Sequence, residues 1–262
     1  MTPSLFISLC HTRKIKYFFI VVAVFVSLPV PLFAEAPFIV TESAVPIERE
    51  TYRLESGLQF NQAGIDRTIL SGTLRYGLIH NLEAVATFPY IFADNDQASR
   101  HRFGDLFLSA KVRFLRGREA NPLSVGGVMR VKVPLANQNS LTGTTGDPDV
   151  GFSLLASKEI PPYEAHLNLG YTFVGSAGSP SGNSNDRISY ALALEYKEVR
   201  PKLSVMGEVF GTSDSIFNDN WTAALGGAYQ IDERIKTDFA LGIGLSDHVS
   251  EYILNARIGY IF

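Results

Sequence analysis

The chain has 262 residues, of which 46% are hydrophobic and 19% charged, and its formal net charge is −3. This near balance gives no electrostatic reason to expect a nucleic-acid partner, and the length fits one domain or one large barrel. The only cysteine, Cys10, precedes the first apolar run, so the rest of the chain is predicted to hold neither a disulfide nor a cysteine metal site.

The first 34 residues have the order of a secretory signal peptide. A basic region is followed by an apolar run over residues 17–33 and then by Ala34-Glu35-Ala36. This order predicts cleavage after Ala34 or Ala36, and Pro37 favours the first site. A membrane-anchoring helix is the alternative, but two prolines interrupt the run, and about 20 apolar residues are needed to span a bilayer.

Residues 35–50 show neither alternation nor glycine turns, and we expect them to form a lead-in on the periplasmic side. Residues 51–262 then contain segments in which apolar residues occupy alternate positions, which places them on one face of a β-strand. After the signal, no apolar run approaches the length of a spanning helix, and a closed barrel leaves no unpaired backbone in lipid. The sequence therefore predicts an all-β fold, a 12-stranded antiparallel transmembrane β-barrel over residues 51–262 of a bacterial outer-membrane protein.

Connection lengths and aromatic positions support this prediction. With both chain ends in the periplasm, the longer connections, at 93–103, 136–149, 175–187 and 212–220, fall outside the cell. Most short connections fall on the periplasmic side, as in outer-membrane barrels, and aromatic residues gather near both ends of the predicted strands. A soluble β-sandwich has no reason to form two such aromatic belts.

The last strand carries a candidate assembly signal. Ile258, Tyr260 and Phe262 alternate up to the C-terminus, which resembles the terminal signal by which outer-membrane barrels are recognised for assembly. We therefore expect the barrel-assembly machinery as a partner, with outer-membrane lipids and lipopolysaccharide as the surroundings. Aspartates in the external loops suit divalent cations shared with lipopolysaccharide, although solvated loop acids are the more usual explanation.

Several short motifs resemble a known family, the outer-membrane transporters named for the meta pathway of phenol degradation. The motifs are Tyr76-Gly77-Leu78, Asn81-Leu82-Glu83, Pro89-Tyr90 and Gly104-Asp105-Leu106, with Val133-Pro134-Leu135 and Gly146-Asp147 one hairpin later. The resemblance covers most of residues 40–262. It implies a β-barrel and suggests transport of small molecules, aromatic compounds among them.

An enzymatic barrel is the first alternative, because some outer-membrane barrels are lipases with a Ser–His–polar triad. His166 lies within a predicted strand, whereas His80, His101 and His248 fall in turns or loops. No Gly-x-Ser-x-Gly elbow and no histidine spacing typical of metal sites occurs in the sequence. We therefore expect no enzyme activity, no cofactor and no metal, with His166 a polar residue of the lumen.

Charged residues of both signs interleave along the predicted inner face. They are Arg53, Glu55, Arg75, Glu83, Lys111, Arg113, Arg130, Lys132, His166, Glu195, Lys236, Asp238 and Arg257. Two interpretations remain open: a structural ion-pair network that fills a narrow barrel, or an aqueous path lined by alternating charge.

Apolar residues break the alternation near the outer mouth, at Ile69, Ile91, Phe107, Val174, Phe210 and Ile253. Local packing beneath the loops is one explanation, and a vestibule that collects an apolar or aromatic solute is the other. On the second reading, a solute enters through this apolar mouth and then meets the charged lower lumen. The sequence thus predicts a channel or transporter for passive uptake of small molecules, with a barrel enzyme and a structural or adhesion barrel as alternatives.

Overall fold

The computed structural model describes residues 38–62, 65–94, 99–118, 121–135, 146–175, 186–214, 220–246 and 249–262. Residues 31–262 form one compact unit, to which the following description applies. The predicted signal peptide, residues 1–34, and its cleavage sites lie outside the described residues. In the described part of the chain, no helix is both long and apolar enough to cross a membrane.

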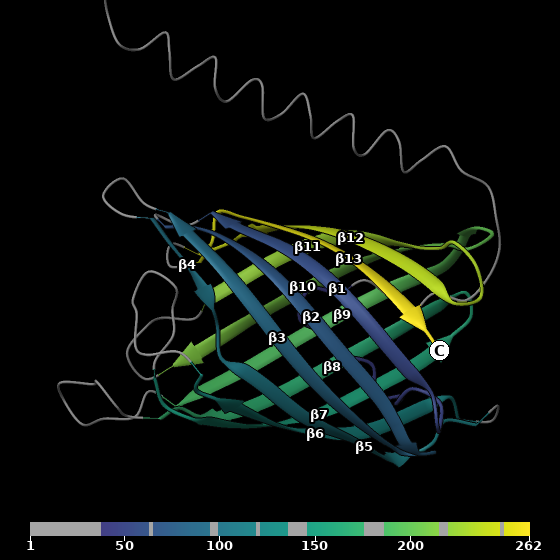
Figure 1. Cartoon of the computed structure of the whole chain (residues 1–262). Coiled ribbons are helices and arrows are strands. Elements are labelled where there is room, and N and C mark those ends of the chain that lie inside the picture. The colour runs from purple at the N-terminus through teal and green to yellow at the C-terminus, as the bar shows by residue number, and fades with distance from the viewer. Residues whose placement is uncertain are drawn as a thin grey trace, which may run out of the picture. The chain divides into compact units, whose positions relative to one another are not determined.

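The described residues form one antiparallel sheet that closes on itself (Figure 1). Its strands are β1 (Tyr52–Gln62), β2 (Asp66–Ile79), β3 (Leu82–Asp94), β4 (Ser99–Phe103), β5 (Leu106–Leu115), β6 (Leu123–Val133), β7 (Asp149–Ile160), β8 (Tyr163–Phe173), β9 (Arg187–Arg200), β10 (Leu203–Asp214), β11 (Asn220–Gln230), β12 (Ile235–Gly244) and β13 (Tyr252–Ile261). The barrel closes where the first strand, β1, pairs antiparallel with the last, β13.

The wall has twelve strand positions, because β4 and β5 both pair with β3 and together occupy one of them. The predicted 12-stranded barrel is therefore confirmed. The interruption lies opposite Pro89, which has no N–H to donate to the ladder, while its carbonyl accepts from Gly104 N at 2.9 Å. A Cβ at residue 104 would lie 2.9 Å from Pro89 Cγ, so this position requires glycine.

Side-chain exposure alternates along the strands as the sequence pattern predicts. Outward residues such as Leu54 and Leu225 are 50% and 72% exposed, whereas inward residues such as Ala193 and Ala240 are buried. A soluble protein rarely exposes so many leucines in regular rows. In a barrel these rows form the lipid-facing band, which identifies the exterior of the wall as a membrane surface.

Aromatic pairs flank this band at both ends of the strands. Near the short turns, Tyr52 stacks on Tyr76 with ring centroids 4.3 Å apart. At the opposite end, Tyr190 packs on Trp221 with the same separation. Aromatic girdles at both membrane interfaces and short turns on the periplasmic side are typical of outer-membrane barrels.

One predicted external loop is shorter than expected. We expected residues 93–103 to form a loop, but β3 extends to Asp94 and Ser99–Phe103 returns as β4 alongside it. The β3–β4 hairpin therefore extends further on the extracellular side than the alternation of apolar residues in the sequence indicates.

Residues 38–50 lie against the inner face of the barrel. Their partners are inward side chains of strands as far apart as β3, β7, β10 and β13. This differs from our expectation of a periplasmic lead-in over residues 35–50. The alternation rule cannot detect such a segment, because it follows neither a helix nor a strand period. We call residues 38–50 the internal segment.

Candidate functional site

The internal segment is held most tightly at the carboxylate of Glu208, on β10. Its oxygens accept hydrogen bonds from the N–H groups of Ile39, Val40 and Thr41 at 2.8, 3.0 and 2.7 Å, and from Thr41 Oγ1 at 2.8 Å. Glu208 is only 3% exposed. Consecutive backbone N–H groups that converge on one anion make a strong, charge-assisted contact, so this carboxylate fixes the start of the segment.

Other lumen residues satisfy the rest of the segment's backbone. Ser157 Oγ accepts from Ala44 N at 2.9 Å, and Glu83 Oε2 accepts from Ile47 N at 3.1 Å. Arg257 Nη2 donates to the Phe38 carbonyl at 3.1 Å. An extended chain inside a barrel needs such partners, because an unpaired buried backbone group is costly.

Asn168 and the side chain of Glu42 anchor the middle of the segment. In the orientation that satisfies both ends of its amide, Asn168 donates to the Glu42 carbonyl and accepts from Glu42 N, at 3.0 and 2.7 Å. The Glu42 carboxylate pairs with Arg130 and lies 3.7 Å from Lys111 Nζ. Two predicted lumen cations thus neutralise an acid that the internal segment supplies.

Apolar contacts complete the fit between the segment and the wall. Phe38 packs with Ala193 and Met206, and its ring meets the His166 ring edge-on with centroids 4.8 Å apart. A second cluster joins Ala44 of the segment to Val128 and Leu155 of the wall.

The segment leaves the lumen at the periplasmic end, where it crosses Gly77. Glu50 has a φ of 60°, and its N–H donates to the Gly77 carbonyl at 2.7 Å. A Cβ at residue 77 would lie 1.9 Å from the Glu48 carbonyl oxygen, so the crossing requires glycine. This explains the glycine of the Tyr76-Gly77-Leu78 motif.

Many of the predicted lumen charges form ion pairs. Arg75 bridges Glu55 and Glu83, at 3.2 and 2.8 Å, and Lys111 Nζ lies 3.5 Å from Glu83. Further pairs are Arg53–Glu55, Lys132–Asp149 and Arg257–Asp238, at 3.8, 2.7 and 2.9 Å. Arg113 instead donates to the His80 carbonyl at the periplasmic rim, at 3.1 Å. Charges of both signs therefore meet across neighbouring strands, as the network interpretation requires.

The six residues of the predicted vestibule occupy the extracellular part of the wall. Ile69 and Ile91 are direct register partners on β2 and β3, and both Ile91 and Ile253 are 8% exposed. Phe107 and Phe210 are half-buried, near the extracellular ends of β5 and β10, and Val174 directly follows β8. Ile69 and Ile91 are thus neighbours, whereas Phe107 and Phe210 belong to distant strands.

The structure brings a serine to His166, the inward histidine of β8. Ser157 Oγ lies 2.8 Å from His166 Nδ1, and Glu164 Oε1 lies 3.9 Å from His166 Nε2. The residue types match a hydrolytic triad, but Ser157 is 2% exposed, and its oxygen already accepts from the backbone of the internal segment. A nucleophile must be reachable by its substrate, so this geometry favours a structural contact.

Sequence reasoning missed Glu42, Ser157 and Glu208 as site residues. A signal was present, because the inner face of β9–β12 is lined by small residues, which leave room inside the barrel. They are Ala191, Ala193, Ala224, Ala228, Ala240 and Gly242. A Cβ on Gly242 would approach Ile39 of the segment to 3.3 Å.

Glu208 gives a second signal. It lies opposite Ala193 and Ala224, so no cross-strand cation faces this inward acid.

Comparisons with known proteins agree with the fold. A family model described as "Putative MetA-pathway of phenol degradation" matches residues 33–262. Among curated protein sequences, none matches this chain.

Solved structures with the same barrel include three outer-membrane proteins. A crystal structure of an outer membrane channel from Pseudomonas putida F1 has a TM-score of 0.65 and 16% identity, covering 87% of this chain and all of that one. The NanC porin has a TM-score of 0.55 and 9% identity, covering 80% and 98% of the two chains. The KdgM porin has a TM-score of 0.55 and 8% identity, covering 80% and 99%. At these identities the similarity establishes the outer-membrane barrel fold.

Proposed function

The chain belongs to the family described as the putative MetA pathway of phenol degradation, and we propose that it is an outer-membrane channel for passive uptake of small molecules. The observation that carries this proposal is the internal segment, which occupies the lumen and is held there by hydrogen bonds and ion pairs to side chains rather than by strand pairing. The known channel and porins of the same fold add support.

In this proposal the internal segment occupies the pathway and regulates it. Its contacts with Glu208, Ser157 and Glu83 are hydrogen bonds to side chains, which break and reform without disturbing the wall ladder. Solutes pass when the segment shifts, or beside it where small inward residues leave space. Passage therefore requires a local rearrangement inside an intact barrel.

We also propose aromatic or other apolar compounds with a polar group as the solutes. The half-buried Phe107 and Phe210 favour apolar contact near the outer mouth. Deeper cations such as Lys111 and Arg257, each paired with an acidic side chain, then favour a hydroxyl or carboxylate, because hydrogen bonds from a cationic donor are stronger than neutral ones. This order of contacts suits phenols and aromatic acids better than alkanes.

Planar bilayers and liposomes test the proposal. The purified chain is expected to give discrete conductance steps, and proteoliposomes containing it are expected to take up benzoate faster than empty liposomes. If properly assembled protein gives neither conductance nor solute flux, the channel function is wrong. Lipid hydrolysis that is abolished by His166→Ala would instead favour the enzymatic alternative.

A further inference from the structure

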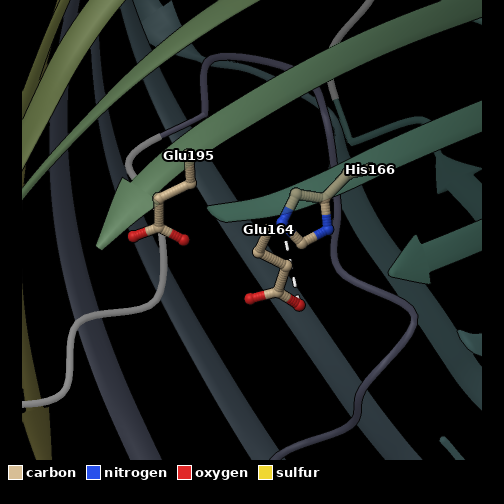
Figure 2. A group of neighbouring side chains, drawn as sticks. All are labelled: Glu164, His166 and Glu195. Atoms are coloured by element: carbon tan, nitrogen blue, oxygen red, sulfur yellow. Dashed lines mark ion pairs between the residues drawn. The ribbon is translucent and has the colours of Figure 1, made fainter. Parts of the chain in front are cut away.

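Three metal-ligating side chains meet on the inner face of β8 and β9, apart from the contacts that hold the internal segment's backbone. Glu164 and Glu195 are direct register partners, and His166 lies two residues further along the same face. One donor atom from each residue lies within 4.8 Å of the other two. Figure 2 shows the three side chains converging from the neighbouring strands.

The cluster brings two carboxylates, Glu164 and Glu195, together on adjacent strands. Like charges directly opposite each other on adjacent strands are destabilising. Lys197 Nζ lies 2.6 Å from Glu164 Oε2 and offsets one carboxylate. Glu195 is 1% exposed, and its Oε1 has no hydrogen-bond partner among the described residues. Lys197 and Lys236 attract the Glu195 charge from nearby, and a ligand at Oε1 would stabilise this buried carboxylate further.

We propose that Glu164, His166 and Glu195 bind a divalent transition-metal ion such as Zn²⁺. One imidazole nitrogen with two carboxylate oxygens is a donor set that suits zinc and its neighbours, whereas Mg²⁺ and Ca²⁺ prefer oxygen ligands alone. Ligand atoms of a four-coordinate zinc lie about 3.3 Å apart, given zinc–ligand bonds of about 2.0–2.1 Å. Metal binding would therefore draw the three donor atoms, which lie within 4.8 Å of one another, closer together through rotation about the side-chain χ angles.

The surroundings of His166 fit metal binding through Nε2. A metal-bound histidine usually donates its other ring N–H to an oxygen, which fixes the ring. Ser157 Oγ lies 2.8 Å from Nδ1 and supplies such an acceptor. A hydroxyl has two acceptor lone pairs, so it accepts from both His166 and Ala44 N. The Phe38 ring covers the histidine from the side of the internal segment.

Zinc titration of the purified full-length barrel tests this site. The protein is stripped with a chelator, equilibrated overnight with ZnCl₂ because the segment covers the site, and analysed by calorimetry and metal content after desalting. We expect one tightly held Zn²⁺ per chain. His166→Ala and Glu195→Gln should each weaken binding at least about tenfold, because each removes a ligand.

Two control variants separate this site from surface binding. His80→Ala alters an exposed histidine in the β2–β3 turn, and Glu159→Gln alters an exposed acid 3.6 Å from Lys197. Both should bind zinc as the unmodified protein does. The proposal is overturned if the unmodified protein holds no zinc, or if His80→Ala and His166→Ala lower the affinity equally.

Two further measurements keep the test decisive. Heat-modifiable gel mobility shows whether His166→Ala assembles. If it does not, the site is tested instead with the near-isosteric Glu195→Gln variant and with the visible spectrum of the unmodified protein loaded with Co²⁺. A spectrum typical of bound cobalt with nitrogen and oxygen ligands supports the site. Binding of Ca²⁺ or Mg²⁺ as tightly as Zn²⁺ contradicts a role for the imidazole.

Discussion

The barrel wall is held in place by strand pairing, whereas the internal segment is held by hydrogen bonds to individual side chains. In the wall, each strand except the short β4 pairs with both neighbours, and the strands present leucine and aromatic side chains to the lipid. The internal segment has no ladder of its own and depends on a few specific acceptors, above all Glu208. Loss of one apolar contact in the wall is therefore shared among many others, whereas loss of one anchor removes a large part of what holds the segment.

Stability and passage of solutes depend on different parts of the molecule. The wall must persist in the membrane, and its backbone bonds cannot exchange with water there. The segment's bonds lie in the lumen, where water can replace them when the segment moves. Substitutions on the lipid face should therefore act on assembly, and substitutions at the anchors should act on passage.

The largest effect is expected from a charge on the lipid face. Leu225 lies in the middle of β11 and is 72% exposed, next to Leu241 in the register. Leu225→Arg should lower the free energy of unfolding by about 2–4 kcal/mol, because the charge must enter the bilayer midplane. Urea titration of the barrel in liposomes measures this change.

Gln59→Arg is the matched control, on the lumen face of β1 beside Asn61. Here the guanidinium reaches the polar interior, so the free energy of unfolding should change much less. Equal destabilisation by the two arginines would contradict the assignment of inner and outer faces.

The wall was predictable from the sequence because its rule is local. Alternation in stretches such as 252–262 fixed the strands, and loop lengths fixed the orientation. The pairing of opposite charges could also be foreseen, since inward residues of neighbouring strands must meet. The interrupted strand at Gly104 was missed because β4 has few apolar residues to alternate.

The internal segment was not predictable by the same means. Its partners on β3, β7 and β10 lie 36 to 169 positions away in the chain, so no window of sequence contains both sides of a contact. Glu42 shows the difficulty, because it lies in a stretch without periodicity and its partners Lys111 and Arg130 already had an explanation as lumen charges. The cluster at His166 likewise required the register of β8 and β9.

The next largest effect should come from the main anchor of the segment. Glu208→Ala leaves the N–H groups of residues 39–41 without their acceptor. Hydrogen bonds to a charged group contribute about 1.5–3 kcal/mol, so release of the segment should become about 10–100-fold more favourable. Conductance should rise, and a maleimide should label Ser43→Cys faster, while the barrel still assembles.

Glu233→Ala, in the exposed β11–β12 turn, controls for the loss of one negative charge. It should leave both the conductance and the labelling rate unchanged. If Glu208→Ala also leaves them unchanged in an assembled barrel, the segment does not regulate passage.

Two glycines of β2 test the exit of the segment with a smaller expected effect. Gly77→Ala forces a methyl group against the Glu48 carbonyl, whereas a Cβ at Gly72 has nothing within 4 Å. Overpacking of this kind costs about 1–3 kcal/mol, part of which is relieved when the segment shifts. Gly77→Ala should therefore speed labelling of Ser43→Cys, and Gly72→Ala should not. Identical labelling rates would mean that the exit is not tightly packed.

The smallest effect is expected at the outer mouth, because the side chains of Phe107 and Phe210 neither hold the wall together nor anchor the internal segment. Aromatic contacts are worth about 0.5–1.5 kcal/mol per pair beyond the area they bury, so Phe107→Ser with Phe210→Ser should slow uptake of benzoate by about 2–10-fold. Uptake of a sugar of similar size should not change, because it gains little from the rings. Since both residues lie on the lumen side, assembly should be preserved. Unchanged benzoate uptake in an assembled barrel would mean that the two rings only pack beneath the loops. Selection of the solute would then take place deeper in the lumen, among the ion pairs around Glu83.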